Sequence, residues 1–564
     1  MRLAVYWTDP AADFLNDSAF HWRMVNAVVT DGHVPEPDGR SDPPAGRDVA
    51  RLLPLGLYAS AAAFHAALGA VGARDLRFNV LLFVALAGGL VALPVWAGAR
   101  ALFGSGWAPV AAAFLAALNP AHLHRTYAYW LRYDALGTLF LVAHLAFALR
   151  ALGGRRVWVE SGLSALCLLA AMATWRVALA IPVIEIAFVL VWAIARGAPP
   201  ALRIWYLLQA VALLVAGVSI PYLRAIGFGF SPPVLATTFL ALALKVPWAR
   251  GARGARAAVL VGAVALAWVV SRIVAPAGVV GEQFAILPAR LGLAPARSPW
   301  LALQLLVEES RAASLRELFG PGFLSWSAPW FFAAPFFLRR RLDAAAALFA
   351  VFAVGVTALT LLFARDKVLL GPVAAVALGG LLFELGPRRW IAAALAVCLA
   401  VTAYDAVQIA ISRRSEPEPA YAAAIRYLAE HSPPGSTILS PWEFGYDLQA
   451  YAGRATATDG LLEAPVNQRR IAAFARAAFA PAPDSLLALA RETNASYLLV
   501  PPSDRLYGLA LVAGVPFRDK LATGRALEPA EAQGVLVQMS VLGRSYSGVE
   551  KELESGSYRV YRVR

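Results

Sequence analysis

The sequence predicts a polytopic α-helical membrane protein that carries a soluble mixed α/β domain at its C-terminal end. Of its 564 residues, 59% are hydrophobic, and the mean hydropathy of +0.61 is far above that of soluble proteins. Apolar blocks recur up to residue 411, and the composition changes after it. We therefore expect three regions: a first external loop over 1–78, a transmembrane domain over 79–411 that includes an external loop at 277–321, and a soluble domain over 412–564.

Twelve apolar blocks are long enough, or nearly so, to cross a bilayer. They cover 79–98, 105–119, 135–149, 157–173, 177–195, 206–222, 233–247, 257–276, 322–338, 343–363, 368–385 and 390–411. The block 52–72 is also apolar but rich in Ala and Gly, and we expect an external helix that lies along the membrane. Residues 1–50 are polar and show no signal peptide, so we expect a thirteenth span upstream of Met1.

The net charge of +14 does not indicate nucleic-acid binding, because the basic residues lie in short loops between apolar blocks. One set of alternate loops holds fifteen Arg and Lys residues, whereas the opposite short loops hold six. The loops richer in positive charge stay in the cytoplasm. The N-terminal 78 residues, the loop 277–321 and everything after residue 411 should therefore lie on the extracytoplasmic side.

The region after residue 411 shows alternating helix and strand signals. A helix pattern over 421–430 runs into the turn Pro433-Pro434-Gly435, and 436–440 reads as a short buried strand. Further strand candidates are 496–500 and 558–563. These signals predict an α/β domain of ordinary size.

Two isolated acids lie in predicted outer loops, where a charge near the membrane needs a partner or a role. Asp17 lies in Asn-Asp-Ser within the first external loop, and Asp134 stands where a span begins at the outer face. Each is either a functional acid, such as a metal ligand or base, or a helix cap.

Glu308 and Glu309 add an acidic pair to an apolar run in the loop 277–321. They are either a solvated helix face or part of a site. Carboxylates from three loops on one face could converge on a hard divalent cation such as Mg²⁺ or Mn²⁺. The two cysteines, Cys167 and Cys398, lie in apolar blocks and suggest neither a disulfide framework nor a softer metal site.

Two cations flank Asp366 at the outer end of a span, namely Arg365 and Lys367. They are either interfacial anchors or a clamp for a phosphate group, which a guanidinium binds well.

These positions, in this order, resemble the catalytic subunit of oligosaccharyltransferase, the N-glycosylation enzyme. The most specific match is residues 439–460, LSPWEFGYDLQAYAGRATATDG, which resemble the family's WWDYG motif and its continuation. Asp17 matches the family's first acidic motif, and residues 125–134 match the second. The run 307–311 matches the third, with Glu309 aligned to its glutamate and Glu308 next to it. Arg365 matches an arginine before a span.

The resemblance implies roles for these residues. Asp17, Asp134 and Glu309 would be catalytic and would hold Mn²⁺ or Mg²⁺, with Glu308 close by. Arg365 and Lys367 would bind the lipid phosphate, and the loop 277–321 would close over the acceptor. The acceptor would be recognised by Trp442, Glu443, Phe444, Gly445 and Tyr446. The partners would be a lipid-linked oligosaccharide, an acceptor polypeptide and membrane lipid, with no nucleic acid, and one subunit would act alone.

Three departures from the family pattern affect the acceptor and metal sites. Pro441 replaces the first Trp of the motif, Glu443 replaces its Asp, and Leu136 stands where the second acidic motif carries another acid. We therefore expect metal chemistry to be retained, while the acceptor sequence can differ from Asn-x-Ser/Thr.

Two alternatives remain open. Another polyprenyl-phosphate-sugar-dependent membrane glycosyltransferase, with a lipid, polymer or hydroxyl acceptor, would need Asp17 but not Glu309 or Trp442. A transporter or non-catalytic scaffold would show polar residues at mid-membrane and internal repeats, whereas this sequence shows no repeat and its acids cluster at the predicted outer face.

Overall fold

The computed structural model describes most of the chain in two compact units. The described residues are 13–246, 252–274, 343–385, 418–462 and 464–564, with short stretches at 2–3, 6–7, 288–291, 293–295, 299–306 and 312–313 and single positions at 396, 400, 403, 404 and 407. The helical unit comprises the described parts of Met1–Pro10, Leu53–Leu291 and Glu308–Arg413. The sheet unit comprises those of Ala11–Leu52, Gly292–Val307 and Arg414–Arg564.

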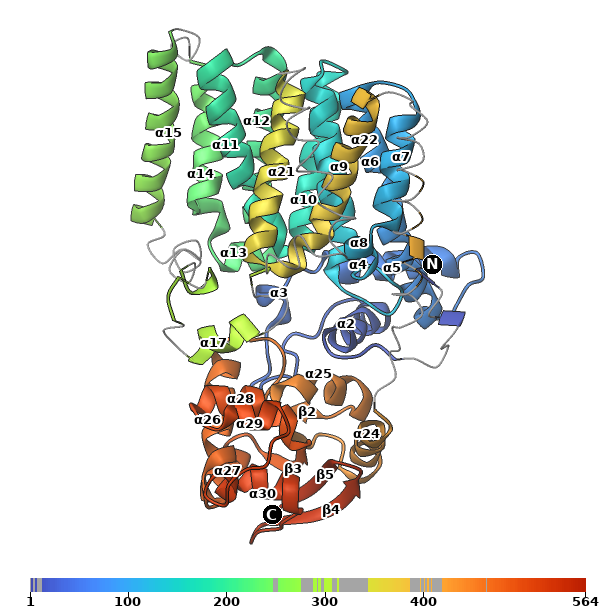
Figure 1. Cartoon of the computed structure of the whole chain (residues 1–564), viewed down its shortest axis with the longest axis vertical. Helices are drawn as coiled ribbons and strands as arrows, with labels where there is room; N and C mark the ends of the chain where they lie inside the picture. Colours follow the sequence, from blue (N-terminus) through green and yellow to red (C-terminus); the bar gives the residue numbers. More distant parts are fainter. Residues whose placement is uncertain are drawn as a thin grey trace. The chain divides into compact units, whose positions relative to one another are not determined.

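The helical unit is a bundle of long apolar helices that run side by side (Figure 1). Its helices include α4 (Gly56–Gly69), α5 (Leu76–Leu90), α6 (Ala92–Phe103), α7 (Trp107–Leu118), α9 (Tyr133–Leu152), α10 (Val157–Thr174), α11 (Ile181–Arg196), α12 (Pro200–Ser219), α14 (Pro232–Ala243), α15 (Arg253–Val274), α21 (Ala344–Leu362) and α22 (Lys367–Leu385). Among the described residues, seven helical segments are long and apolar enough to cross a membrane. They are Leu76–Phe103, Tyr133–Leu152, Val157–Thr174, Arg176–Arg196, Pro200–Ser219, Arg253–Val274 and Ala344–Leu362.

Helices occupy the positions of ten predicted spans. The predicted span 322–338 falls on residues that the structure does not describe, as does almost all of 390–411. Two helices at predicted spans, α7 and α14, have 12 residues each and are shorter than a membrane crossing. The 14-residue helix α4 lies in the block 52–72 and is also too short to span, so its predicted course along the membrane stays a prediction.

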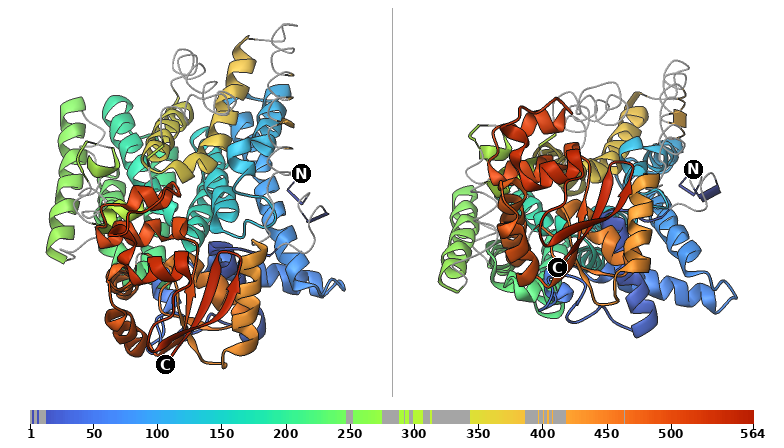
Figure 2. Two further views of the ribbon diagram at one scale, coloured as in Figure 1. Left: turned by 60° about the horizontal axis from the view of Figure 1, so that its bottom comes forward. Right: turned by 90° about the horizontal axis from the view of Figure 1, so that it is seen from below.

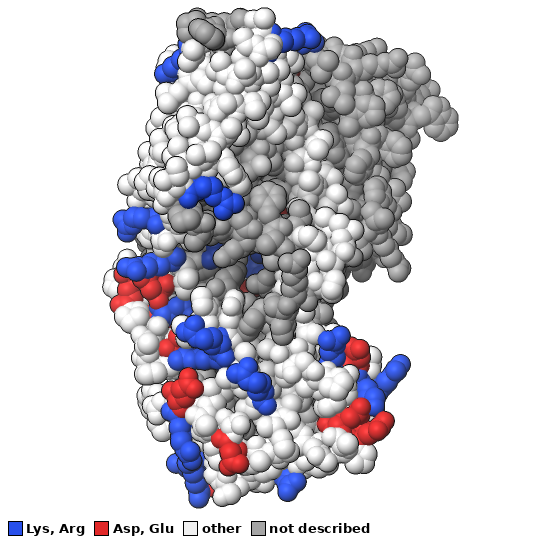
Figure 3. All heavy atoms as spheres, turned by 90° about the vertical axis from the view of Figure 1, so that its left-hand side faces the viewer, with Lys and Arg blue, Asp and Glu red and all other residues white. Residues whose placement is uncertain are grey.

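Small residues allow close helix packing in this unit, and some of the polar groups in its interior are paired. A Cβ atom on Gly137 of α9 would lie 2.6 Å from the Cβ of Trp175, so only glycine fits there. His144 Nε2 of α9 lies 2.9 Å from Glu185 Oε1 of α11, and both side chains are buried. The bundle surface in Figure 3 shows a broad band without charged side chains among the described atoms, as expected of a membrane protein.

The sheet unit is built on five strands in the order β2-β1-β3-β5-β4. The strands are β1 (Thr437–Leu439), β2 (Ala455–Thr456), β3 (Ala495–Val500), β4 (Val549–Ser555) and β5 (Tyr558–Val563). The first three pair in parallel, whereas β5 pairs antiparallel to both β3 and β4. Residues 558–563 therefore lie inside the sheet, between β3 and β4.

The two faces of the sheet bury separate hydrophobic cores, because side chains alternate along each strand. Leu498 and Val500 of β3 face a core formed with α26 (Pro465–Phe479), α27 (Asp484–Glu492), α28 (Tyr507–Ala513) and α30 (Val535–Leu542). Tyr497 and Leu499 face the other core, against α24 (Pro419–His431). Figure 2 shows α24 along one side of the strands and the red helices along the other.

Two segments from elsewhere in the sequence complete the sheet unit. The first-loop segment, Ala11–Leu52, contains α2 (Asp17–Asp31) and α3 (Val49–Leu52), and α2 packs on α25 (Gly445–Asp447) and the π-helical turn η6 (Leu448–Ala452). Helix α17 (Pro299–Leu306), from the predicted outer loop, packs on α28 and buries Leu303.

The predicted elements of the C-terminal region are confirmed. The helix expected at 421–430 is α24, and the strands expected at 436–440, 496–500 and 558–563 are β1, β3 and β5. The sequence signals were sufficient here because each strand is bounded by a turn or a loop. Strand β3 is nearly continuous in apolar residues, and β5 is rich in Tyr and Val, with Arg559 and Arg562 between them.

Gly445 is a position where the packing should tolerate no side chain. An added Cβ would collide with the carbonyl oxygen of Thr458 and lie 2.7 Å from the Cα of Asp459. We expect Gly445→Ala to destabilise the sheet unit by about 1–3 kcal/mol, measured as the free energy of unfolding of the purified protein. Gly39→Ala is the matched control, because nothing lies within 4 Å of that added Cβ. Equal stability of the two variants would contradict this packing argument.

Candidate active site

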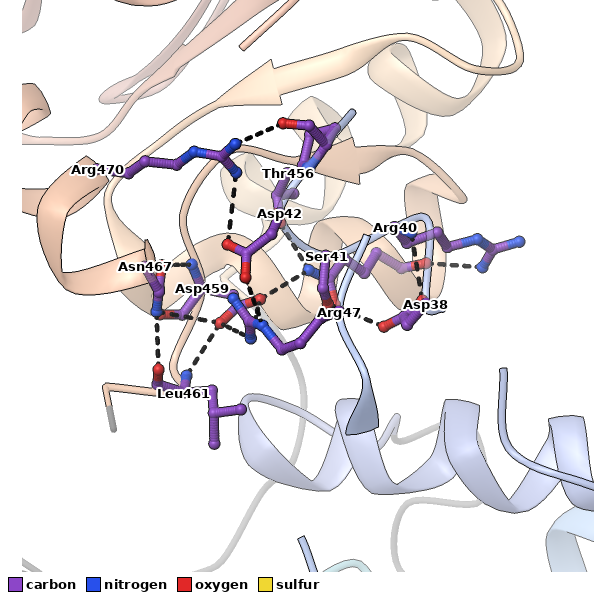
Figure 4. Close-up of polar contacts among 12 residues, drawn as sticks. Asp38, Arg40, Ser41, Asp42, Arg47, Thr456, Asp459, Leu461, Asn467 and Arg470 are labelled. Atoms are coloured by element: carbon purple, nitrogen blue, oxygen red, sulfur yellow. Dashed lines mark hydrogen bonds and ion pairs between the residues drawn. The ribbon is translucent and has the colours of Figure 1, made fainter. Parts of the chain in front are cut away.

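A buried ionic network fastens the first-loop segment within the sheet unit (Figure 4). Arg47 lies between two carboxylates: its Nε donates to Asp42 Oδ2 at 2.8 Å, and its Nη1 donates to Asp459 at 2.8 and 2.9 Å. All three side chains are at most 7% exposed. Burial lowers the pKa of Arg47, but Asp459 and Asp42 outweigh this effect and raise it. The guanidinium is therefore held charged between its two partners.

A second buried pair extends the network. Arg23 of α2 donates two hydrogen bonds to Asp38, at 2.7 and 2.6 Å, and a third to Gln449 Oε1 at 2.9 Å. Gln449 in turn donates to Thr456 Oγ1 at 2.7 Å. Burial raises the pKa of Asp38, yet the hydrogen bonds and the charge of Arg23 hold it below the usual range. The first-loop segment is thus anchored on η6 and on β2.

The segment places Asp17 at the beginning of α2. Asp17 is the first residue of the helix, is half-buried, and is preceded by Asn16, whose side chain makes no cap hydrogen bond. The main-chain N–H of Asn16 donates to Asp447 Oδ1 at 2.7 Å. Phe20, one turn into α2, packs on Tyr446 with ring centroids 4.8 Å apart. The helix that begins with the first predicted acid therefore packs against the helical segment that follows the Trp-Glu pair.

The predicted acceptor motif forms a tight turn in the sheet unit. Residues Trp442–Phe444 make a 3₁₀ turn, η5, that leads directly into α25. Helix α28 covers this corner, since an added Cβ on Gly508 would lie 3.4 Å from Trp442 Cζ2 and 3.6 Å from Glu443 Oε1. Burial raises the pKa of Glu443 to about 7, against the opposing charge of Arg505. This carboxyl group can therefore gain or lose a proton near neutral pH.

The second predicted acid lies in the helical unit. Asp134 is the second residue of α9, and its carboxyl group is 3% exposed. Its Oδ2 accepts from Arg125 Nη1 at 3.5 Å and from the indole nitrogen of Trp130 at 3.4 Å. The Arg125 guanidinium also lies over the Trp130 ring, 5.2 Å from its centroid. Residues 125–134 thus fold into one compact group of aromatic and charged side chains.

Arg365 and Lys367 lie beside a buried acid in the same unit. The 3₁₀ turn η4 (Ala364–Asp366) joins α21 to α22, which begins at Lys367. Asp366 is 2% exposed, and Arg365 Nε lies 3.8 Å from its Oδ1. Burial raises the pKa of Asp366 to about 7, opposed by Arg365 and assisted by the charge of Asp134. Sequence reasoning treated Asp366 only as a neighbour of the two cations.

The structure describes two of the four candidate metal ligands, Asp17 and Asp134. Glu308 and Glu309 fall on residues that the structure does not describe, and Asp17 and Asp134 belong to different units. Within the described residues, no group of three His, Cys, Asp or Glu side chains could hold a metal ion. Asp17 and Asp134 each lie in the first turn of a helix, and carboxylate oxygens are ligands that Mn²⁺ and Mg²⁺ prefer.

Sequence reasoning missed the residues that hold the site together. Asp447, Arg47 and Asp38 are buried and paired, yet each lies in a polar stretch that reads as a loop or a turn. Asp447 and Asp459 both belong to the quoted motif and could have been noticed, because a buried acid needs a partner from elsewhere in the chain.

The fold and these placements define the class of the protein. It is an integral membrane protein in which a bundle of apolar helices is joined to a C-terminal α/β domain. Residues 15–259 match the family described as oligosaccharyl transferase STT3, N-terminal. This match covers 245 of the 564 residues, so this part of the chain is similar to the catalytic subunit of oligosaccharyltransferase.

Solved structures of the archaeal enzyme share the fold. The structure of oligosaccharyltransferase AglB from Archaeoglobus fulgidus, in complex with an inhibitory peptide and a dolichol-phosphate, has a TM-score of 0.74 at 14% identity and covers 98% of this chain and 78% of its own. An Archaeoglobus fulgidus oligosaccharyltransferase tethered with an acceptor peptide containing the NVT sequon has a TM-score of 0.64 at 16% identity, covering 96% and 76%. The same enzyme in complex with Zn and sulfate also has a TM-score of 0.64 at 16% identity, covering 96% and 75%. A comparison with curated protein sequences gives no match.

The Arg47 network should be essential for the stability of the sheet unit. Arg47→Leu would leave Asp42 and Asp459 as buried carboxylates without this cation, at a cost of about 3–5 kcal/mol in the free energy of unfolding. Arg51→Leu is the matched control, because the Arg51–Asp48 pair is exposed and its loss should cost no more than about 1 kcal/mol. Chemical unfolding of the purified proteins measures both. A similar loss in the two variants would refute the role of Arg47.

The Glu443 carboxyl group should make stability depend on pH. Its folded pKa of about 7 lies above the ordinary 4.5, so the folded state retains a proton that the unfolded chain releases. Its contribution to the free energy of unfolding therefore decreases as pH rises from about 4.5 to about 7. Glu443→Gln should flatten the pH dependence of the thermal unfolding midpoint across this range. Glu492→Gln, on the exposed end of α27, should leave it unchanged; identical profiles for the wild type and Glu443→Gln would contradict the assignment.

Proposed function

We propose that this protein transfers a glycan from a polyprenyl-(pyro)phosphate carrier to a protein acceptor, an asparagine side chain, at the extracytoplasmic face of the membrane. The main support is the family match of residues 15–259 together with the archaeal oligosaccharyltransferase fold over 98% of the chain. The relatives were solved with a dolichol-phosphate and with an acceptor peptide, which are the two kinds of ligand that this reaction needs.

The orientation and span count belong to this proposal. The positive charges of alternate loops favour an extracytoplasmic first loop and C-terminal domain. We expect the twelve spans that the sequence predicts and a domain arrangement of 1–78, 79–411 and 412–564. One subunit would act alone on the lipid-linked oligosaccharide and the acceptor polypeptide.

The carboxylates would bind the metal ion and the acceptor amide. Asp17, Asp134 and Glu309, with Glu308 next to it, would hold Mn²⁺ or Mg²⁺, which when bound supplies positive charge beside the reacting groups. Asp17 would also accept a hydrogen bond from the acceptor amide and weaken its conjugation with the carbonyl. The amide nitrogen then forms a bond to the anomeric carbon from the face opposite the carrier, which inverts the configuration at that carbon.

The two cations at and next to η4, Arg365 and Lys367, would neutralise the charge of the leaving group. The bond between the anomeric carbon and the carrier oxygen breaks as the new bond forms, and the negative charge passes to the pyrophosphate. Arg365 and Lys367 would neutralise it. Because pyrophosphate leaves readily, no acid is needed to protonate it, and the amide loses one proton to the surrounding water or base.

The Trp442–Glu443 corner would select the acceptor. With Pro441 in place of a tryptophan, this corner has one indole donor fewer than the family motif. The longer acid Glu443 lies under α28 and titrates near neutral pH. An acceptor hydroxyl that donates to Glu443 would bind its ionised form, so acceptor affinity should rise with pH. These departures also favour a second candidate, in which the acceptor is a hydroxyl group.

Single substitutions of the described acids test the proposal. Asp17→Asn and Asp134→Asn should each lower the rate of glycan transfer by at least about a hundredfold, because charge stabilisation at the reacting centre contributes that much. The assay is mass spectrometry of an acceptor peptide incubated with lipid-linked sugar, purified protein and Mn²⁺, and EDTA should abolish transfer. Asp31→Asn is the matched control, since Asp31 is the exposed last residue of α2.

Two outcomes would count against the asparagine acceptor. Full transfer by both variants would remove the acids from the mechanism. Transfer that depends on both acids but modifies only hydroxyl-containing peptides or lipids would favour the second candidate.

A further inference from the structure

The residue before Asp17 adopts an unfavourable backbone conformation. Asn16 has φ 55° and ψ −127°, a region that residues with a side chain rarely occupy and that costs free energy unless the surroundings enforce it. The conformation occurs where residues 13–15, which have no regular secondary structure, lead into α2. It therefore sets the direction in which the first residue of α2, Asp17, leaves the loop.

The carboxyl group of Asp447 holds the main chain of this turn. Its Oδ1 accepts the 2.7 Å hydrogen bond from the Asn16 N–H, and its Oδ2 accepts from the hydroxyl of Tyr421 at 3.2 Å. Asp447 is 3% exposed. A short hydrogen bond to a buried carboxyl group, whose second oxygen is also engaged, leaves the Asn16 amide little freedom to move.

A second side chain of the same helical segment holds the loop two residues earlier. The hydroxyl of Tyr451 donates to the carbonyl oxygen of Phe14. Phe14 is buried and stacks on Trp22 of α2, with ring centroids 5.2 Å apart. Asp447 and Tyr451, four residues apart on α25 and η6, thus bind one N–H and one C=O of the loop 14–16.

We propose that Asp447 is a positioning residue for Asp17: through the Asn16 amide it fixes the turn that presents the Asp17 carboxylate. The inference rests on the proposed function, in which Asp17 is a metal ligand. Asp447 follows Trp442 and Glu443 on one continuous helical segment. The acceptor corner and the start of α2 are therefore held by the same short piece of chain.

The test separates the hydrogen bond from the charge. Asp447→Asn keeps an acceptor oxygen for the Asn16 amide, whereas Asp447→Ala removes it. We measure Mn²⁺ binding to the full-length purified protein by electron paramagnetic resonance, and the Mn²⁺ concentration that half-saturates glycan transfer. Asp447→Ala should raise the dissociation constant for Mn²⁺ and the half-saturating Mn²⁺ concentration about 10–100-fold. Loss of a residue that orients a metal ligand usually weakens metal binding by such a factor. Asp447→Asn should change them by less than about threefold, because its amide oxygen still accepts the hydrogen bond.

Two further variants guard against a general loss of folding. Tyr451→Phe should also weaken Mn²⁺ binding, while Tyr497→Phe should not, although the Tyr497 hydroxyl makes a comparable hydrogen bond to the His431 carbonyl in the same unit. Asn16→Gly in the Asp447→Ala background should recover part of the affinity, because glycine adopts a positive φ at little cost.

The outcomes distinguish this inference from the proposed function. If Asp17→Asn abolishes Mn²⁺ binding while Asp447→Ala binds Mn²⁺ like the wild type, the positioning role is refuted and the function stands. If Asp17→Asn itself neither weakens Mn²⁺ binding nor slows transfer, the proposed function fails. The inference would also be overturned if Asp447→Ala and Asp447→Asn lost the same Mn²⁺ affinity and Asn16→Gly recovered none of it.

Discussion

The ion triplet of Arg47 with Asp42 and Asp459 is the interaction on which the sheet unit depends. A buried guanidinium is tolerated only when carboxylates surround it, and here the two carboxylates come from opposite ends of the sequence. Without this triplet the first-loop segment would lose its ion pair to Asp459 and would be held on η6 only by contacts such as that of Arg23 with Gln449. Because α2 begins within that segment, the position of Asp17 depends on an ionic network whose members the proposed mechanism does not use.

The architecture followed from the sequence where signals were local. Strands β1, β3 and β5 and helix α24 were predicted close to their observed bounds, and long apolar blocks became helices. The paired polar residues were not predictable in this way. His144 and Glu185 meet across α9 and α11, and Asp447 meets Asn16 from 431 positions away. Such partners share no periodicity, and only the folded chain brings them together.

The candidate site was predictable as a set of residues but not as an arrangement. Motif resemblance selected Asp17, Asp134, Arg365 and the Trp442–Tyr446 run, and the structure gives each described residue a defined environment. Resemblance could not indicate Asp366, since nothing local distinguishes it from an interfacial acid. Asp366 is buried beside Arg365, and the charge of Asp134 acts on it. The acid of the second motif, Asp134, therefore interacts with a second acid, Asp366.

The order of the strands has a consequence for how the protein is made. Strand β5 lies inside the sheet, so the sheet cannot be completed before residue 563 has left the ribosome. Asp459 is made 412 residues after Arg47, so their ion pair can form only after that interval. At ordinary elongation rates this interval lasts roughly 20–80 s. During it the earliest part of the sheet unit has no permanent partner and is open to chaperones and proteases. Folding of the sheet unit can therefore finish only after the last strand, β5, has been made. A stalled or shortened chain would retain its apolar helices but lack a complete sheet unit.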